Sequence, residues 1–232
     1  GVISIDDGYS YVMTCGHGQS GVTATFDANF GQRAFTYTPP TGYKTLNSEN
    51  LSPNVPSIVR PQRFFDCLTY TGNGSTQSVS GLEFKPDFVW IKERSSGSEH
   101  KIFDVVRGVQ KAISSASNGA EEDQSNYLTS FHDHGFVVGN DGAVNENSQT
   151  YVAWCWKAGG ATTVSNTSGS VTSAVSANQE AGFSIVTYTG PNGNGTIGHG
   201  LGKAPKWIVI RRRNNASTWT VYHESMGNTH RL

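Results

Sequence analysis

The chain has 232 residues, of which 27 are glycine, and its formal net charge at pH 7 is −1. A near-neutral chain creates no field that would attract nucleic acid or an anionic membrane, and no run approaches the roughly 18 consecutive apolar residues of a membrane-spanning helix. Short aromatic and β-branched runs alternate with stretches of glycine, serine, threonine and asparagine, which is typical of sheets joined by many turns. The composition therefore favours an all-β protein.

Residues 1–54 predict the last strands of a β-sandwich. Tyr9–Met13 and Val22–Phe26 alternate as half-buried strands do, and a proline pair then ends any ladder. A proline-rich stretch follows, so residues 55–62 are expected to form an extended linker. The chain opens at Gly1 on a strand pattern without an initiator methionine, which suggests that upstream residues are absent.

Residues 63–157 predict a first complete β-sandwich repeat. Its expected strands are Phe65–Tyr70, Asp87–Lys92, Gly135–Gly139 and Thr150–Trp156. Asn140–Gly142 is a hairpin-type turn signal, and Val109–Ala116 has apolar residues at a helix-like spacing.

Residues 158–181 are almost wholly small and polar, and they predict a spacer or an exposed arm between two repeats. Beyond them, the sequence pattern of Leu68–Arg94 is repeated in Val186–Arg213. Residues 182–232 are therefore expected to be the start of a second, truncated repeat.

The register of the duplication can be read from equivalent residues. Tyr70 and Tyr188 lie 118 positions apart, whereas Trp90 and Val209 lie 119 apart, so one residue has been inserted in a Gly/Asn-rich loop. We expect Trp90 and Val209 to occupy matching interior strands. Leu232 corresponds to a residue well inside the first copy, which suggests a fragment cut within a repeat. The fold class predicted is all-β, with jelly-roll or concanavalin-like sandwich modules in series, incomplete at both ends.

The densest group of possible metal ligands, His132, Asp133 and His134 with His100 nearby in the sequence, gives a weak signal. His132 and His134 are two apart and could share an ion if they lay on a strand, and Asp141 lies in a loop that offers oxygens to a hard cation. Ordinary turn chemistry explains these residues better, because the loops lack the acidic density of a dedicated site. We therefore expect neither a metal nor a cofactor.

No motif predicts an enzyme. Gly193–Gly198 fits a G-x-G-x-x-G pattern but opens no helix, and no nucleophile elbow is present. A hydrolase would need paired carboxylates, whereas Glu83 and Glu93 fall opposite Gly202 and Arg212 in the second copy. The cationic run at positions 211–213 is expected to be a solvated strand end.

Five tryptophans allow two interpretations. Trp90, Trp154, Trp156 and Trp207 lie in apolar strand runs and predict core burial, although aromatic side chains could also stack on sugars. Trp154 and Trp156 should share a face of one strand, as residues two apart do. Trp219 lies outside such runs and is the one candidate ligand-binding residue.

Three cysteines at positions 15, 67 and 155 have neither zinc-binding spacing nor an even number for a disulfide framework. Cys155, between two tryptophans, is expected to be buried as a small hydrophobe.

Asn29–Asn47 resembles the C-terminal end of SPRY-like, concanavalin-type sandwich domains in virion proteins of tailed phages, notably marine ones. The repeats resemble the module that often follows it, on Phe88–Lys92, Tyr151–Trp156 and Gly198–Ile208. The resemblance implies a virion structural protein, such as a tail fibre, spike or other surface appendage, and brings no catalytic residues.

From the resemblance we expect a non-enzymatic scaffold and host-adhesion element on the phage particle surface. Its partners would be other virion proteins, copies of itself in a homo-oligomer and a host surface glycan, but neither nucleic acid nor membrane. The alternatives are a lectin-like carbohydrate-binding module and a polysaccharide depolymerase.

Overall fold

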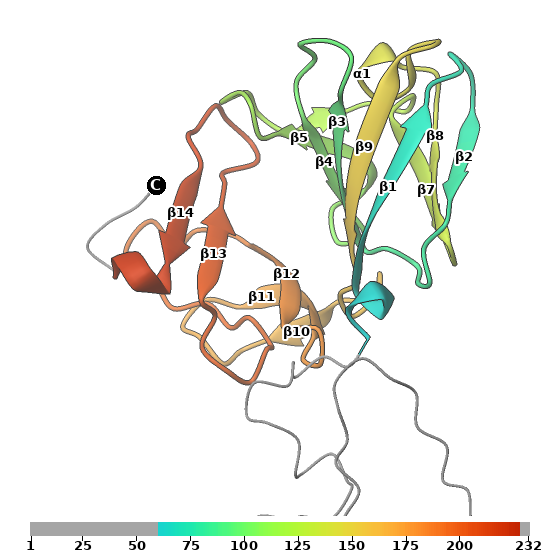
Figure 1. The fold of residues 1–232 in the computed structure, drawn as a ribbon. Coiled ribbons are helices and arrows are strands. Elements are labelled where there is room, and N and C mark those ends of the chain that lie inside the picture. The colour runs from blue at the N-terminus through green and yellow to red at the C-terminus, as the bar shows by residue number, and fades with distance from the viewer. Residues whose placement is uncertain (1–59, 228–232) are drawn as a thin grey trace, which may run out of the picture. The chain divides into compact units, whose positions relative to one another are not determined.

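The computed structural model describes residues 60–227. The sandwich end expected over residues 1–54, and nearly all of the expected linker over 55–62, lie outside these residues. The described chain is almost entirely β, which confirms the predicted all-β fold class. It consists of a β-sandwich followed by two smaller sheets (Figure 1).

The sandwich has a six-stranded and a three-stranded antiparallel sheet. The larger sheet has the spatial order β1 (Phe65–Thr71), β9 (Thr150–Trp156), β3 (Phe88–Glu93), β4 (Lys101–Asp104), β5 (Gly108–Ser114) and β6 (Glu122–Asp123). The smaller sheet has the order β2 (Gln77–Ser80), β8 (Gly135–Val138) and β7 (Leu128–His132). The four strands expected in the first repeat are confirmed to within one residue or two.

The core lies between these two sheets. Val89 and Ile91 of β3 are fully buried there, together with Phe136 and Val138 of β8. Strand β9 alternates strictly, with Tyr151, Ala153 and Cys155 facing the core and the intervening residues half-buried on the outer face. The burial of Cys155 and the shared outer face of Trp154 and Trp156 are thus confirmed.

The helix-like spacing over Val109–Ala116 is misleading, because residues 108–114 form β5. Ala112 faces the sandwich core, whereas its neighbours Ile113 and Ser114 are also buried but lie outside that core cluster. Both faces of β5 are covered only over residues 112–114, since Gln110 is exposed and Lys111 half-buried.

The turn expected at Asn140–Gly142 is instead the start of a short helix, α1 (Gly142–Asn145). Asp141 is its N-cap, and its carboxylate accepts a hydrogen bond from the Ala143 N–H at 2.8 Å. The described residues also contain two short 3-10 helices, η2 (Pro61–Arg63) and η3 (Glu224–Met226). Among residues 60–227 no helix has the length and apolar character needed to cross a membrane.

The spacer expected at residues 158–181 holds two strands, β10 (Val164–Asn166) and β11 (Ser173–Asn178), which form a sheet with β12 (Phe183–Tyr188). Serine hydroxyls make burial possible in a segment with little apolar mass. Ser173 donates to the Gly198 carbonyl at 2.9 Å, and Ser176 donates to the Gly160 carbonyl at 2.7 Å.

The second copy repeats the strand pairing of the first. Its hairpin of β13 (Trp207–Ile210) and β14 (Thr220–His223) pairs Trp207 with His223 and Val209 with Val221. The first copy pairs Phe88 with Asp104 and Trp90 with Ile102, the same register displaced by 119 positions. Strand β12 likewise corresponds to β1.

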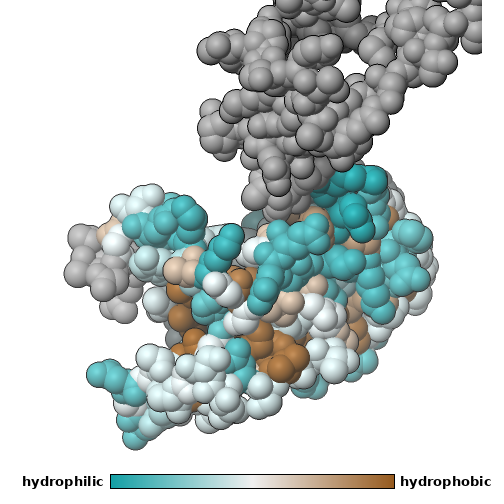
Figure 2. Space-filling view, turned by 90° about the horizontal axis from the view of Figure 1, so that it is seen from below, coloured by the Kyte–Doolittle hydropathy of each residue, from teal (hydrophilic) through white to brown (hydrophobic). Residues whose placement is uncertain are grey.

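Trp90 and Val209 thus lie on matching strands, but the expectation that both are interior is wrong. Trp90 is half-buried on a central strand, whereas Val209 is 42% exposed on an edge strand. Exposed apolar surface of this kind is visible in Figure 2, where it lies in a hollow framed by hydrophilic side chains.

Candidate functional site

The outer face of the large sheet carries a group of aromatic side chains around Trp90 and Trp154. These two residues are direct partners across β3 and β9, and their rings meet edge to face with centroids 5.9 Å apart. Both are half-buried, because the core lies on the other side of the sheet. Each indole therefore keeps part of its surface accessible to a binding partner.

His100 completes this group, which we call the Trp–His cluster (Trp90, His100 and Trp154). The Trp90 Nε1–H donates to His100 Nδ1 at 2.9 Å, and the His100 ring lies parallel to the Trp154 ring with centroids 6.4 Å apart. Burial, together with the charge of Lys92, lowers the pKa of His100 below its usual value. The imidazole is therefore neutral at pH 7, and its remaining proton is on Nε2.

Such a cluster offers two aromatic faces and one N–H donor. This combination can stack against the apolar face of a sugar ring and donate to a hydroxyl.

The other end of the aromatic face is covered by the second copy. Phe183 of β12 stacks on Trp156, with centroids 5.9 Å apart, and meets Phe88 edge to face at 5.7 Å. Trp156 also packs against Phe65, with ring centroids 4.8 Å apart. These contacts make Trp156 part of the packing between the copies.

The residues singled out as metal candidates each have other partners in the structure. His132 Nε2 lies 3.2 Å from the Ser78 hydroxyl, and His134 Nδ1 lies 3.2 Å from the Leu82 carbonyl oxygen. Asp141 caps α1 instead of facing either histidine. Within residues 60–227 no three His, Cys, Asp or Glu side chains form a group that could hold a metal ion.

Trp219, the candidate ligand-binding residue, is part of a connection between the copies. Its Nε1–H donates to the Ser114 carbonyl at 3.2 Å, and the Arg211 guanidinium lies over its ring, 5.0 Å from the centroid. An indole held in this way has its N–H donor and one face already occupied.

The cationic run at positions 211–213 is not a wholly solvated strand end, although Arg212 is exposed. Arg211 Nη1 donates to the carbonyls of Ser114 at 2.7 Å and Ser117 at 2.6 Å. Arg213 forms a two-pronged pair with Glu121, at 2.9 and 2.8 Å. Two of the three arginines therefore bind the first copy and are not free for phosphate.

Glu121 also links this pair to a buried ion cluster. Arg107 reaches Glu121 at 3.2 Å and pairs with Asp104, and the side chains of Arg107 and Asp104 are only 5% and 4% exposed. Burial opposes the ionisation of Glu121, but hydrogen bonds from Arg213 and Arg107 outweigh it and lower the pKa of this carboxyl.

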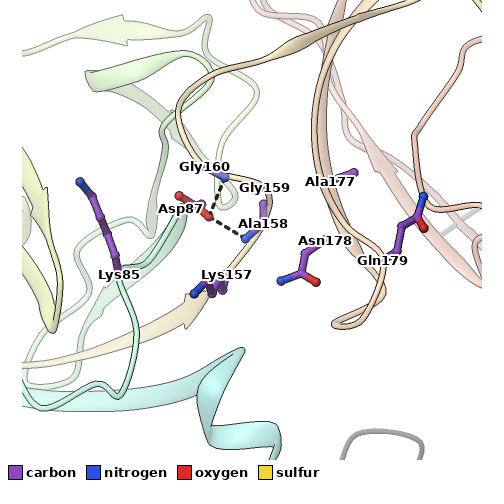
Figure 3. Close-up of a pocket in the computed structure, with 9 residues that line it drawn as sticks. All are labelled: Lys85, Asp87, Lys157, Ala158, Gly159, Gly160, Ala177, Asn178 and Gln179. Carbon is purple, nitrogen blue, oxygen red and sulfur yellow. Dashed lines mark hydrogen bonds between the residues drawn. The ribbon is translucent and has the colours of Figure 1, made fainter.

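A shallow pocket of about 470 Å³ lies where β9 leads into the second copy, beside Asp87 (Figure 3). Asp87 is 3% exposed, and its Oδ2 accepts from the N–H groups of Ala158 at 2.8 Å and Gly160 at 3.2 Å. Burial raises the pKa of Asp87, although these hydrogen bonds and nearby lysines oppose the rise. In Figure 3 the Lys85 side chain extends away from the carboxylate.

Sequence reasoning missed Asp87 and the pairing of His100 with Trp90. Asp87 had a usable signal, since its equivalent in the second copy is Lys206 and a charge reversal inside a repeat marks a local role. His100 had none, because its contact with Trp90 depends on how the loop between β3 and β4 folds.

A family model described as a domain of unknown function (DUF7483) matches residues 60–232, a stretch that includes both copies and the segment between them. No curated protein and no solved structure matches the chain significantly.

Proposed function

We propose that this chain, which belongs to the DUF7483 family, a domain of unknown function, is a structural component of a phage virion. Within the particle it serves as a scaffold and host-adhesion element of a tail fibre, spike or other surface appendage. The observation that carries the proposal is the repeated hairpin, in which β13 and β14 pair in the register of β3 and β4. Repetition lets an appendage lengthen by duplication while each unit keeps its own pairing.

The contacts between the copies suit a load-bearing role. Arg211 and Trp219 both bind the Ser114 carbonyl, and Arg213 pairs with Glu121. Charge-assisted and two-pronged hydrogen bonds fix orientation as well as distance, so these ties hold one copy against the next.

The virion setting is drawn from the resemblance of Asn29–Asn47 and of the repeats to tailed-phage proteins. In that setting the partners are other virion proteins, further copies of this chain and a host surface glycan. The location is the surface of the particle.

The test is to locate the protein on particles. Antibodies raised against residues 60–227 are expected to decorate one defined appendage of intact virions in electron micrographs and to slow adsorption to the host. Detection in infected cells without any label on intact particles would contradict the proposal.

A second candidate function is carbohydrate binding by the Trp–His cluster, favoured by the half-exposed indoles of Trp90 and Trp154 beside a neutral imidazole. The intact chain and two variants, Trp154→Ala and Trp219→Ala, are compared on a glycan array. Loss of a sugar signal in Trp154→Ala but not in Trp219→Ala supports this function. A signal unchanged in Trp154→Ala removes the cluster as its site.

A further inference from the structure

The Trp–His cluster lies next to a fixed positive charge. Lys92 follows Trp90 by two residues on β3, so both side chains are on the outer face of the sheet. The Lys92 Nζ donates to the carbonyl of Glu93 and, at 3.1 Å, to that of Ser96, which holds the ammonium at the start of the loop between β3 and β4. Burial and the charge of Lys92 together lower the pKa of His100, so this charge acts on the imidazole of the cluster.

Within residues 60–227, Lys92 forms no ion pair. The carboxylate next to it in the sequence, Glu93, is on the core side of β3, where it is 3% exposed. Its oxygens accept hydrogen bonds from the hydroxyls of Ser95 and Ser98. Two of the three N–H groups of Lys92 are bonded to carbonyls, so the ammonium keeps one donor and its charge for a ligand. Because the side chain is already fixed, binding costs it little further entropy.

Strand pairing places this charge in line with an exposed hydroxyl. Strand β9 lies between β1 and β3 (Figure 1), and its Val152 pairs with Lys92 on one side and with Thr69 on the other. In the adjacent row of the same face, Trp154 pairs with Trp90. The two rows are about 7 Å apart, because a strand rises 3.3–3.4 Å per residue. A ring that stacks on the indoles can therefore carry a substituent into the row of Lys92.

The accessible part of this face lies toward β1. Thr69 and Thr71 are exposed, and Thr150 of β9 is half-buried opposite Thr71. At the other end of the face, Phe183 stacks on Trp156 and covers it. The surface that remains for a ligand therefore combines the indoles of the cluster, the Lys92 ammonium and threonine hydroxyls.

This combination fits one class of sugar. The indoles suit the apolar face of a pyranose ring, and the hydroxyls suit its hydroxyl groups. A neutral sugar would leave the fixed charge without a partner, and a simple anion would make no use of the indoles. A hexuronic acid has the stacking face and the carboxylate on the same ring.

We propose that the Trp–His cluster, together with Lys92, binds hexuronic acid residues of an acidic glycan. The sugar ring lies against the indoles of Trp90 and Trp154, and its carboxylate accepts a charge-assisted hydrogen bond from the Lys92 Nζ. This inference rests on the second candidate function, sugar binding by the cluster, and names the class of sugar.

The test measures the affinity of the intact chain for oligomers of galacturonate, glucuronate and mannuronate by isothermal titration calorimetry. The methyl esters of the same oligomers keep the ring and remove the charge. We expect at least one acid oligomer to bind about fivefold or more tightly than its ester, the effect of one charge-assisted hydrogen bond. The difference should shrink as the salt concentration rises.

The variant Lys92→Met removes the charge and keeps most of the apolar stem. It should lower the affinity for the acid oligomer to that for its ester and leave the affinity for the ester unchanged. Lys203→Met is the matched control, because Lys203 is exposed outside the cluster and its loss changes the net charge equally. Trp154→Ala should weaken binding of both the acid and the ester.

Four results would overturn the proposal. Equal affinity for acid and ester, both dependent on Trp154, would leave sugar binding by the cluster in place and remove the preference for uronate. Absence of binding by every acid oligomer to a chain that melts cooperatively would do the same, and the glycan array then decides whether neutral sugars bind. An equal loss in Lys203→Met would assign the preference to net charge, and acid binding that survives Trp154→Ala would place it elsewhere.

A measurement on the unaltered chain decides the role of Lys92 even if Lys92→Met fails to fold. The acid oligomer should slow acetylation of Lys92 but not of Lys203, as followed by mass spectrometry, and its methyl ester should not. Equal acetylation of Lys92 with and without a bound acid oligomer would contradict the contact.

Discussion

Asp87 and Lys206 occupy equivalent positions in the two copies, yet the carboxylate is buried and the ammonium is exposed. Asp87 accepts two backbone N–H bonds from the turn after β9, whereas Lys206 pairs with Glu224 at 2.7 Å on the surface. One main-chain contact is shared by the two positions, since each carbonyl accepts a hydrogen bond from the equivalent residue of the neighbouring strand. The duplicated hairpin therefore has the same strand pairing in both copies, whereas the side chain at this position has a different role in each.

We predict that Asp87→Ala destabilises the chain by about 1–3 kcal/mol, the usual cost of leaving a buried backbone donor unpaired. Ala158 is 3% exposed, so its N–H has no ready access to water once the carboxylate is gone. Asp87→Asn should cost less, because an amide oxygen can still accept. Urea unfolding followed by circular dichroism measures both, and equal losses for the two variants would contradict this role of the oxygen.

The Trp–His cluster predicts a loss of stability in mild acid. Burial, with the charge of Lys92, holds the pKa of His100 below 6.5, so the unfolded chain takes up this proton more readily than the folded one. The stability that neutral His100 contributes is therefore present above pH 6.5 and is lost as the pH falls through the folded-state pKa. Protonation also turns Nδ1 from an acceptor of the Trp90 N–H into a donor.

The variant His100→Asn tests this directly, because its side-chain oxygen can take the place of Nδ1 without titrating. Melting temperatures measured between pH 7.5 and pH 5 should fall less in the variant than in the unaltered chain. Equal pH dependence in the two proteins would show that His100 is not responsible.

Glu121→Gln should destabilise the chain by about 2 kcal/mol, the upper part of the range for hydrogen bonds to charged groups. The substitution removes the charge that Arg107 and Arg213 share, and the side chain of Arg107 is only 5% exposed. Because the pKa of Glu121 is lowered, its contribution is present above about pH 4.5 and is lost as the pH falls.

Asp123→Asn is the matched control, since the Lys111–Asp123 pair is exposed and such pairs contribute about 0–1 kcal/mol. Chemical denaturation at pH 7 and pH 4 measures the loss of unfolding free energy in each of the two variants. A loss as large for Asp123→Asn as for Glu121→Gln would contradict the special role of the ion cluster.

Asn145 should tolerate no acidic replacement. It is fully buried, and its side-chain N–H₂ donates to the Gly139 carbonyl at 2.7 Å and to Asn73 Oδ1 at 3.1 Å. Asn145→Asp would face these oxygens with a buried charge, so we expect a loss of about 3 kcal/mol or more. Asn145→Leu fills the same space without charge and should cost less. Thermal denaturation ranks the two variants, and the reverse order would contradict the prediction.

The strands that sequence reasoning found share one property: a core lies on one side of them. In β9 burial alternates strictly, but the sequence signal for this strand was the apolar and aromatic run of Thr150–Trp156. Strand β5 is covered on both faces only over residues 112–114, and its apolar residues at 109, 112 and 113 have a spacing that also fits a helix. The prediction of a spacer or an exposed arm over residues 158–181 failed for another reason. Ser173 and Ser176 are buried there because their hydroxyls form hydrogen bonds, although the segment has little apolar character.

The candidate site was less accessible from the sequence than the fold. Tryptophan in a strand indicates that one face of a sheet is apolar, but not that Trp90 would meet a histidine ten positions later across a loop. Trp219 was chosen because it lies outside an apolar run, whereas the residue that occupies its ring, Arg211, lies eight positions upstream. Pairings between loops depend on backbone paths that no local periodicity encodes.

The hydrogen bonds and the ion pair that join Arg211, Arg213 and Trp219 to residues 114–121 have a thermodynamic consequence. A hairpin of two short strands is marginal alone in water, so β13 and β14 draw their order from the larger sandwich to which these side chains are bound. Heating should then produce a single calorimetric peak for both copies together. Cutting the ties with a double Arg211→Ala, Arg213→Ala change would release the hairpin as an early, separate transition.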